Sequence, residues 1–192
     1  MESRGARVAD AVTTIGRELD VVLAATARTG PDALARIADL LSAAPRVFVL
    51  GAGRSGLALR MTAMRLMHLG LAVHVVGDVT TPAIASGDLL LTASGSGTTA
   101  GILRAAETAH AVGAAVAVMT TAEDSPLARS ATVAVIVPAA DKLDRSGAAS
   151  AQYAGGLFEQ AVVVLGDALF HALWKRSGQT ADDLWPRHAN LE

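Results

Sequence analysis

The first 44 residues carry a helical pattern of apolar positions. Between residues 5 and 28, apolar side chains recur at spacings of four and three, at Val8, Val12, Ile15, Leu19 and Val22. A face this narrow packs against another helix, either of this chain or of a partner. Gly30-Pro31 breaks the pattern, and residues 32–44 are predicted to form a second helix.

From Pro45 onward, short β-branched and aliphatic runs alternate with helical patterns. The runs predicted as strands are residues 46–50, 72–76, 88–93, 115–119 and 132–137. Helical patterns occupy residues 55–69 and 98–112. Continuously apolar strands indicate a parallel sheet that is covered on both faces. We therefore expect an α/β fold, a doubly wound five-stranded parallel sheet with helices on both faces and the flavodoxin-like order 2-1-3-4-5.

The last part of the chain returns to loop and helix. Residues 138–150 are polar and rich in small side chains, so a mobile loop is expected there, and a long helix should follow over residues 152–176. Thr180 and Asp183 have the spacing of a capping pair for a last short helix, which Pro186 limits. The whole chain is predicted to be one domain, with N-terminal helices (1–44), the main sheet region (45–138), a loop (139–150) and C-terminal helices with a tail (151–192).

Composition narrows the class of protein. The 192 residues are enough for one substantial core. No run of about 18 residues lacks charge and strong polarity, and the N-terminus lacks a basic-then-apolar signal, so we expect a cytoplasmic protein without a membrane span. A formal net charge of -2 and the lack of a Lys/Arg cluster give no electrostatic support for binding nucleic acid or an anionic membrane. The absence of cysteine excludes disulfides and thiolate chemistry.

A glycine-rich loop follows the first predicted strand. Residues 51–56 read Gly-Ala-Gly-Arg-Ser-Gly, which is formally G-x-G-x-x-G, and Asp78 ends the second strand. This is the dinucleotide-binding pattern in its usual context, with the acidic residue placed for a ribose. A tight strand-to-helix turn that needs glycine and binds nothing would show the same pattern.

A second glycine-rich loop follows the third predicted strand. Residues 94–99 read Ser-Gly-Ser-Gly-Thr-Thr and lead into a helix. Helix N-termini favour anions, and glycines let the backbone approach a ligand. Ser96 or Thr98 could serve only as an N-cap, but one cap needs one hydroxyl and the loop offers four.

Topology brings the two loops together. In the order 2-1-3-4-5, the first and third strands are neighbours at the switch point, and ligands bind at their carboxyl ends. A compact phosphate monoester needs several small donors around one group, whereas a dinucleotide does not need a hydroxyl-rich second loop. The pattern therefore favours a sugar phosphate over a dinucleotide.

Several motifs then resemble a known family. GAGRSG, MRLMHLG, TTPAI, GDLL, SGSG, LFEQ and the ending RHANLE are similar to those of the sugar isomerase (SIS) domain family, over roughly residues 10–192. Within this family they most resemble the 6-phospho-3-hexuloisomerases of the ribulose monophosphate pathway, which serves formaldehyde assimilation. The resemblance implies isomerisation between D-arabino-3-hexulose 6-phosphate and D-fructose 6-phosphate through a cis-enediolate.

The resemblance also assigns binding residues. It implies that the phosphate is bound by hydroxyls of the two loops, at Ser55, Ser94, Ser96 and Thr99. Further substrate contacts are expected at Gly53, Arg54, Gly95 and Thr98. Two segments depart from the family pattern: Thr98 stands where the family has glutamate, and residues 153–156 read Tyr-Ala-Gly-Gly in place of Pro-Met-Gly followed by Ser or Thr. The second departure lies near the expected base and bears on substrate preference.

Two residues are candidates for acid–base chemistry. Moving a proton between carbons next to a carbonyl needs one positioned base and a group that stabilises the enediolate. Glu159, near the start of a long apolar helix, fits either a partly desolvated base or a solvent-facing glutamate by sequence alone, which slightly favours the second, and the resemblance implies that it is the base. The resemblance also places His188, five residues from the chain end, in the active site of a neighbouring subunit.

The remaining expectations concern other histidines, metals and assembly. His68 is expected to pack late in a helix, and His74, His110 and His171 are assigned to structure. No metal-ligand pattern is present in the sequence, so neither a metal nor an organic cofactor is expected. The apolar N-terminal face and the tail both indicate a homo-oligomer, for which the family implies a tetramer arranged as a dimer of dimers.

Three other functions stay open at this point. One is another isomerase of the same domain type, such as an arabinose-5-phosphate isomerase, which commonly carries extra domains. A second is a non-catalytic sugar-phosphate sensor, which usually carries a DNA-binding domain for which this chain has neither room nor basic charge. The third is a nicotinamide enzyme, which would use Asp78 on a ribose.

Overall fold

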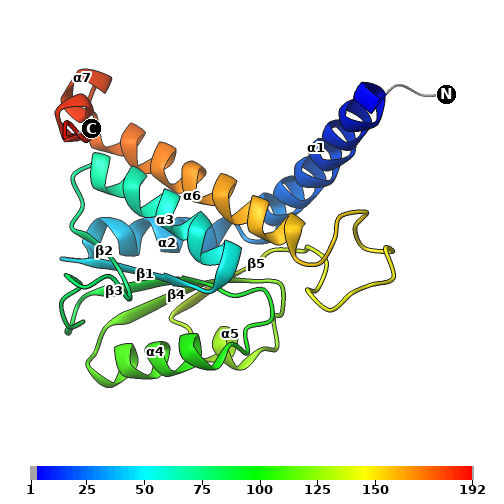
Figure 1. Ribbon diagram of the computed structural model, residues 1–192. Helices are drawn as coiled ribbons and strands as arrows, with labels where there is room; N and C mark the ends of the chain where they lie inside the picture. Colours follow the sequence, from blue (N-terminus) through cyan, green and yellow to red (C-terminus); the bar gives the residue numbers. More distant parts are fainter. Residues whose placement is uncertain (1–3, 192) are drawn as a thin grey trace.

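A five-stranded parallel sheet forms the middle layer of the computed structural model, which describes residues 4–191 (Figure 1). The strands are β1 (Val47–Gly51), β2 (Val73–Val75), β3 (Leu89–Ala93), β4 (Ala115–Thr120) and β5 (Val133–Ile136). Their spatial order is β2-β1-β3-β4-β5, and every neighbouring pair is parallel. The predicted fold class, strand positions and strand order are therefore confirmed, because continuously apolar strands need cover on both faces.

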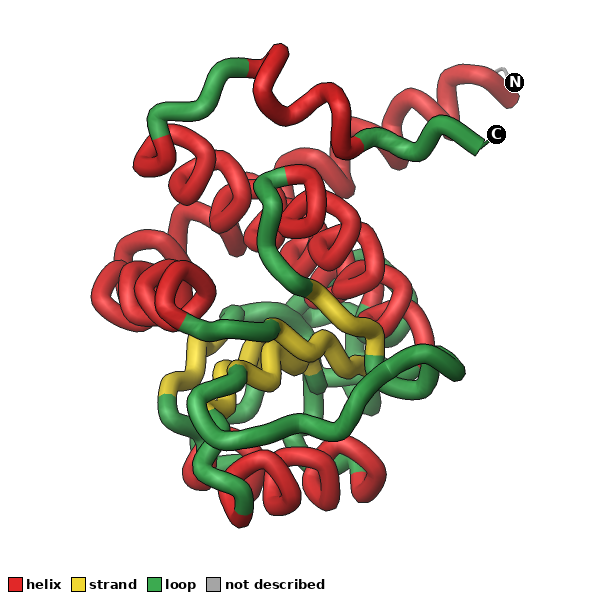
Figure 2. Tube along the Cα trace, turned by 90° about the vertical axis from the view of Figure 1, so that its left-hand side faces the viewer, coloured by secondary structure: helices red, strands yellow, loops and turns green. Residues whose placement is uncertain are grey.

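Helices cover the two faces of the sheet unequally. α2 (Pro31–Ala43), α3 (Gly53–His68) and α6 (Gly156–Ser177) lie on one face, and α4 (Ala100–Ala111) and α5 (Pro126–Ser130) lie on the other (Figures 1 and 2). Two clusters of buried side chains match these layers, a larger one with α3 and α6 and a smaller one with α4. The short helix α5 was not predicted from the sequence.

The first helix is only half covered. α1 (Arg4–Thr29) packs near its C-terminal end on the other helices, where Val22 is buried. Its other half extends away from the sheet (Figure 1). Val8 is 65% exposed and Val12 is 66% exposed, although both belong to the predicted apolar face. Within this chain, the apolar face of α1 is therefore covered along only half of its length.

The C-terminal segment differs from the prediction at one boundary. α6 begins at Gly156, four residues later than expected, because Ala154 has a left-handed backbone (φ 54°) that ends the loop before it. The chain then forms α7 (Ala181–Leu184) and a 3₁₀ turn (Trp185–Arg187). Thr180 and Asp183 make the reciprocal capping box, which confirms the predicted pair.

One helix, α6, has the length and apolar composition of a membrane span, although its sequence includes Glu159 and Asp167. In the structure, 56% of its most apolar window is buried, against α3, α1 and α2. The apolar composition of α6 is thus accounted for by its place in the core.

Candidate active site

The turn between β1 and α3 depends on two glycines that touch. A Cβ atom on Gly56 would lie 2.4 Å from the backbone oxygen of Gly51, so neither position has room for a side chain. This contact packs the first turn of α3 onto the end of β1. It brings Arg54 and the buried Ser55 to the carboxyl edge of the sheet, where the first N–H groups of α3 have no partner within the helix.

The loop between β3 and α4 is folded around its own hydroxyls. The Oγ of Ser94 and the Oγ1 of Thr99 are 3.2 Å apart, and Ser94 is buried. The Oγ1 of Thr98 donates a hydrogen bond to the Oγ of Ser96 at 3.0 Å. Thr99 is the N-cap of α4, but its side chain makes no capping hydrogen bond. The hydroxyls of this loop are therefore not explained by helix capping.

The loop between β3 and α4 is held by residues that the sequence analysis did not identify. The hydroxyls of Thr120 and Thr121 both donate to the backbone oxygen of Gly95, at 3.0 and 2.9 Å. Gly97 has a φ of 60°, and a Cβ there would overlap the side chain of Ser125, which caps α5. The Ser125-Pro126 pair was a readable signal for α5, since serine caps helices and proline suits their first position.

The two loops and the start of α6 enclose a cavity of about 370 Å³. Most of the predicted site residues line it: Gly53, Arg54, Ser55, Ser94, Gly95, Ser96, Thr99 and Glu159. Glu159 lies in the first turn of α6, and its carboxylate forms an ion pair of 3.1 Å with Arg54. The side chain of Glu159 is 20% exposed and that of Arg54 is 63% exposed, so the arginine faces the opening.

The sequence analysis missed Lys142, which also lines the cavity. It belongs to the polar segment between β5 and α6, which was expected only to be a loop. With Arg54 it gives the cavity two cations against the single carboxylate of Glu159, and this excess suits an anionic ligand. The usable signal was that Lys142 is a cation in a loop at the same sheet edge as the two glycine-rich loops.

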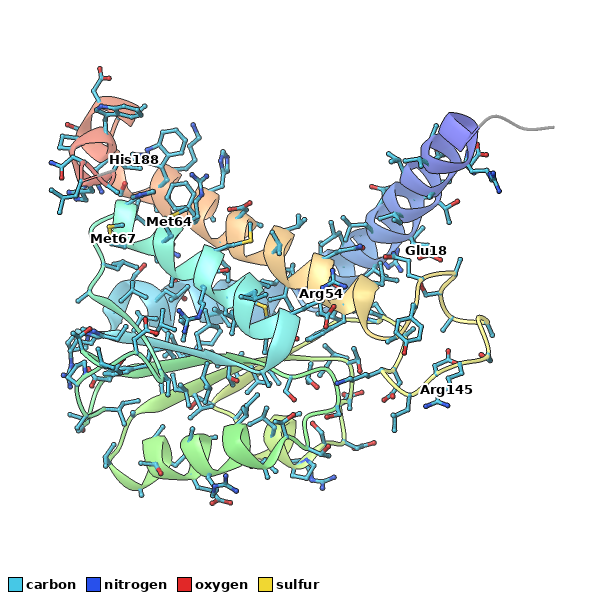
Figure 3. The ribbon with its side chains drawn as sticks, viewed as in Figure 1. Glu18, Arg54, Met64, Met67, Arg145 and His188 are labelled. Atoms are coloured by element: carbon cyan, nitrogen blue, oxygen red, sulfur yellow. The ribbon has the colours of Figure 1, made fainter. Side chains whose placement is uncertain are left out.

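Two predicted residues lie outside the cavity. Thr98 is exposed on the outer side of its loop and contacts Ser96 rather than the cavity. His188 lies at the other end of α3, far from Arg54 (Figure 3). Asp78, which a dinucleotide enzyme would place on a ribose, is ion-paired with Arg60 on the surface at 2.9 Å. Among residues 4–191, no group of three histidine, aspartate or glutamate side chains is arranged to hold a metal ion.

His188 is held at that far end by aromatic stacking. Its ring lies 3.9 Å from the ring of His68, at an interplanar angle of 29°, and 4.9 Å from the ring of Trp185. His68 is buried, which confirms its packing role, and its Nδ1 has no hydrogen-bond partner among the described residues. Burial lowers the pKa of His68, and the nearby charges of His188 and Arg65 lower it further.

Comparison with known proteins agrees with this geometry. A family profile described as the SIS domain matches residues 40–158. The chain is 56% identical to the 3-hexulose-6-phosphate isomerase of Mycobacterium gastri, over 90% of this chain and 87% of that protein. It is 35% identical to the 3-hexulose-6-phosphate isomerase of Bacillus subtilis, over 82% of this chain and 85% of that protein.

A solved structure shows the same architecture. The Methanococcus jannaschii protein, whose crystal structure was described as implying a molecular function of 3-hexulose-6-phosphate isomerase, superposes with a TM-score of 0.80. The match covers 95% of this chain and 99% of that one at 26% sequence identity. The family profile covers more than half of the chain and includes both glycine-rich loops and Glu159's neighbour Phe158. The chain therefore belongs to the SIS domain family.

Proposed function

We propose that this protein is an isomerase that interconverts D-arabino-3-hexulose 6-phosphate and D-fructose 6-phosphate. The observation that carries the proposal is the single cavity that joins the hydroxyls of Ser94 and Thr99 to the carboxylate of Glu159. One part of this cavity suits a phosphate and the other part holds a base. The similarity to proteins named 3-hexulose-6-phosphate isomerase supports this choice among sugar phosphates.

The phosphate end would be the loop between β3 and α4 together with the first turn of α3. Ser55, Ser94, Ser96 and Thr99 supply small donors there, and Lys142 supplies a positive charge. N–H groups at the start of a helix add favourable partial charges for an anion. Anchoring the phosphate fixes the distance from the base to the carbons that exchange a proton.

The base would be Glu159. A substrate with its ketone at C3 and its O6 esterified cannot close an ordinary five- or six-membered ring, so it binds as an open chain. Glu159 would take the proton from C2 and return it to C3, or the reverse, through a cis-enediolate. The ion pair with Arg54 would hold the carboxylate in one orientation, and the guanidinium would stabilise charge that develops on the enediolate oxygens.

His188 would complete the site of a second copy. α3 has 16 residues, about 24 Å in length, with the cavity at its first turn and the His68–His188 stack at its last. Leu57, Met61 and Met64 form an apolar stripe along its exposed side, 63%, 52% and 54% exposed. If two copies pack through this stripe about a two-fold axis perpendicular to α3, the two helices run antiparallel. The tail of each copy then lies beside the first turn of α3 in the other.

This arrangement makes the functional unit at least a dimer. The exposed half of α1, with Val8 and Val12, offers a second apolar surface, and two different interfaces of this kind build a dimer of dimers. We accordingly propose a cytoplasmic homotetramer that uses neither a metal nor an organic cofactor, since transfer of a proton between adjacent carbons needs none.

The experiment is a coupled assay of the purified protein. A hexulose-phosphate synthase forms the 3-hexulose 6-phosphate in place from ribulose 5-phosphate and formaldehyde, and the appearance of fructose 6-phosphate is measured. Glu159→Gln should lower kcat about 10²- to 10⁴-fold. The exposed Glu107→Gln on α4 is the matched control and should be unchanged. Near-normal turnover by Glu159→Gln, or none by the unmodified protein, contradicts the proposal.

The role of His188 across subunits has its own test. Glu159→Gln and His188→Ala are each expected to be impaired, but co-assembly of the two restores one intact site in every mixed pair. Random pairing should recover roughly a quarter of the wild-type activity. If both residues act within one chain, mixing restores nothing.

A further inference from the structure

The segment that brings Lys142 to the cavity has few ties to the rest of the protein. Among the residues that the structure describes, the Gly156 N–H donates to the Tyr153 oxygen at 3.4 Å where the segment 140–154 enters α6, and every other hydrogen bond from this segment to another element ends on Glu18 or Gln160. The other hydrogen bonds of this segment are internal, such as those from Leu143 and Ser146 to nearby aspartates. Its position over the cavity therefore depends on very few groups.

Glu18 supplies most of these ties from α1. Its carboxylate accepts hydrogen bonds from the Ala151 N–H at 2.7 Å, the Ser150 Oγ at 2.8 Å and the Gln152 Nε2 at 3.0 Å. The Ala151 N–H, Gln152 and Ser150 together hold the pKa of Glu18 below its ordinary value. Figure 3 shows Glu18 on the side of α1 that faces this segment.

Gln152 connects Glu18 to α6 through a second hydrogen bond. Its Oε1 accepts a hydrogen bond of 2.8 Å from the Nε2 of Gln160, the residue that follows Glu159. A Cβ on Gly156 would lie 3.4 Å from the same Gln152 oxygen and 3.9 Å from the Nη1 of Arg54. Gln152 is therefore packed against the first turn of the helix that carries Glu159.

The segment 140–154 ends in a strained backbone conformation, and both of its ends lie beside the cavity. Ala154 has a φ of 54°, a conformation that costs free energy for a residue with a side chain and persists only where the surroundings fix it. A Cβ on Gly155 would lie 3.9 Å from both the Glu159 Oε1 and the Lys142 Cβ. The beginning and the end of the segment thus meet beside the carboxylate of Glu159.

We infer that Glu18 is a positioning residue that sets the segment 140–154, and with it Lys142 and the first turn of α6, against the cavity. It acts through Ser150, Ala151 and Gln152 and does not line the cavity itself. The inference rests on the proposed function for its kinetic consequence, because Lys142 contributes to phosphate binding there. Its structural consequence, an ordered segment, is independent of any substrate.

The hydrogen-bond pattern offers a reciprocal test. In Glu18→Gln, the amide nitrogen that replaces Oε2 faces the Gln152 Nε2, so two donors meet. Adding Gln152→Glu restores a donor–acceptor pair, and the new carboxylate still accepts from Gln160. Asp20→Asn, an exposed change of the same charge two residues along α1, is the matched control.

The first readout needs no substrate. Trypsin cleaves after Lys142 and Arg145, both exposed in the segment. Glu18→Gln should speed this cleavage about tenfold, Asp20→Asn should not change it, and the double variant should return it close to wild type. If Glu18→Gln does not fold, Gln152→Leu breaks the contact from the other side and should give the same increase. An unchanged cleavage rate, or no rescue by the double variant, overturns the inference.

The second readout is the coupled assay. Glu18→Gln should raise KM for the sugar phosphate about tenfold while kcat falls less, and the double variant should recover KM. A merely structural role would lower the amount of folded enzyme and leave KM unchanged. If the unmodified protein does not isomerise this substrate, the proposed function fails, and the proteolysis result still decides the role of Glu18.

Discussion

The two ends of α3 are held by different kinds of contact. At the first turn, the closest contact is between backbones, since Gly56 and Gly51 touch, and the Arg54–Glu159 ion pair lies beside it. At the last turn, side chains meet: the His68 ring stacks on His188, and the Arg187 Nη1 donates to the His68 oxygen at 3.2 Å. A backbone contact leaves no space for an added atom, whereas a side-chain contact can be removed while the fold remains. The two ends should therefore respond very differently to substitution.

The largest effect is expected from a single methyl group at the first end. In Gly56→Ala the new Cβ would lie 2.4 Å from the Gly51 oxygen, and neither backbone can move without displacing β1 or α3. We expect a loss of about 3 kcal/mol in the free energy of unfolding, measured in urea. Gly101→Ala, at a helical position with nothing within 4 Å, is the control and should gain roughly 0.5–1 kcal/mol. Equal stability of the two variants would contradict the backbone contact.

A moderate effect is expected from Arg187→Ala at the other end. The Nη1 of Arg187 donates to the His68 oxygen, to the Gln179 Oε1 at 3.1 Å and to the Asp183 oxygen at 3.1 Å. Losing these hydrogen bonds should cost about 1–2 kcal/mol in the free energy of unfolding and free the tail that carries His188. Arg36→Ala, an exposed change on α2, should be neutral. A stable Arg187→Ala with normal kcat would show that the tail needs no such anchor.

Contacts that arise from local sequence patterns could be predicted, whereas contacts between side chains far apart in the sequence could not. The sheet order and the positions of the two glycine-rich loops followed from apolar runs and glycines, which are local patterns. Glu18 and Ser150 are 132 positions apart, and no periodicity or motif relates them. α5 was missed because a five-residue helix is too short to show a helical period.

The residues of the candidate site can likewise be divided into those that the sequence predicted and those that it did not. The residues carried by the two glycine-rich loops were predicted to share one cavity, and the structure brings them together. Lys142 was missed because a lysine in a polar loop looks like any solvated cation until the segment is placed. The separation of His188 from Arg54, the ion-pair partner of Glu159, was expected only from the family resemblance, since the sequence alone does not show where a tail folds back.

A smaller effect is expected on the pH dependence of stability, through His68 at the last turn of α3. The pKa of His68 is lowered mainly by burial, so the folded state binds a proton less readily than the unfolded state. The stability that His68 contributes should be complete above the ordinary histidine pKa of about 6.5 and fall as the pH drops below it. His68→Phe keeps a stacked ring without this titration, so its thermal midpoint should depend less on pH between neutral and mildly acidic conditions. The exposed His110→Gln should follow the wild type, and a parallel decline in His68→Phe would assign the pH dependence to other groups.

The smallest effect is expected beside the first end, where one side chain can be changed without loss. Thr92 in β3 is fully buried, and its Oγ1 has no hydrogen-bond partner among the described residues. Thr92→Val removes a desolvated hydroxyl and keeps the shape, so the free energy of unfolding should stay equal or rise by about 1 kcal/mol. KM should not change, because Ser94 and Thr99 contact each other rather than Thr92. A loss of stability would mean that the hydroxyl has a partner such as a buried water, so that the strand beside the first turn of α3 depends on a side-chain hydrogen bond.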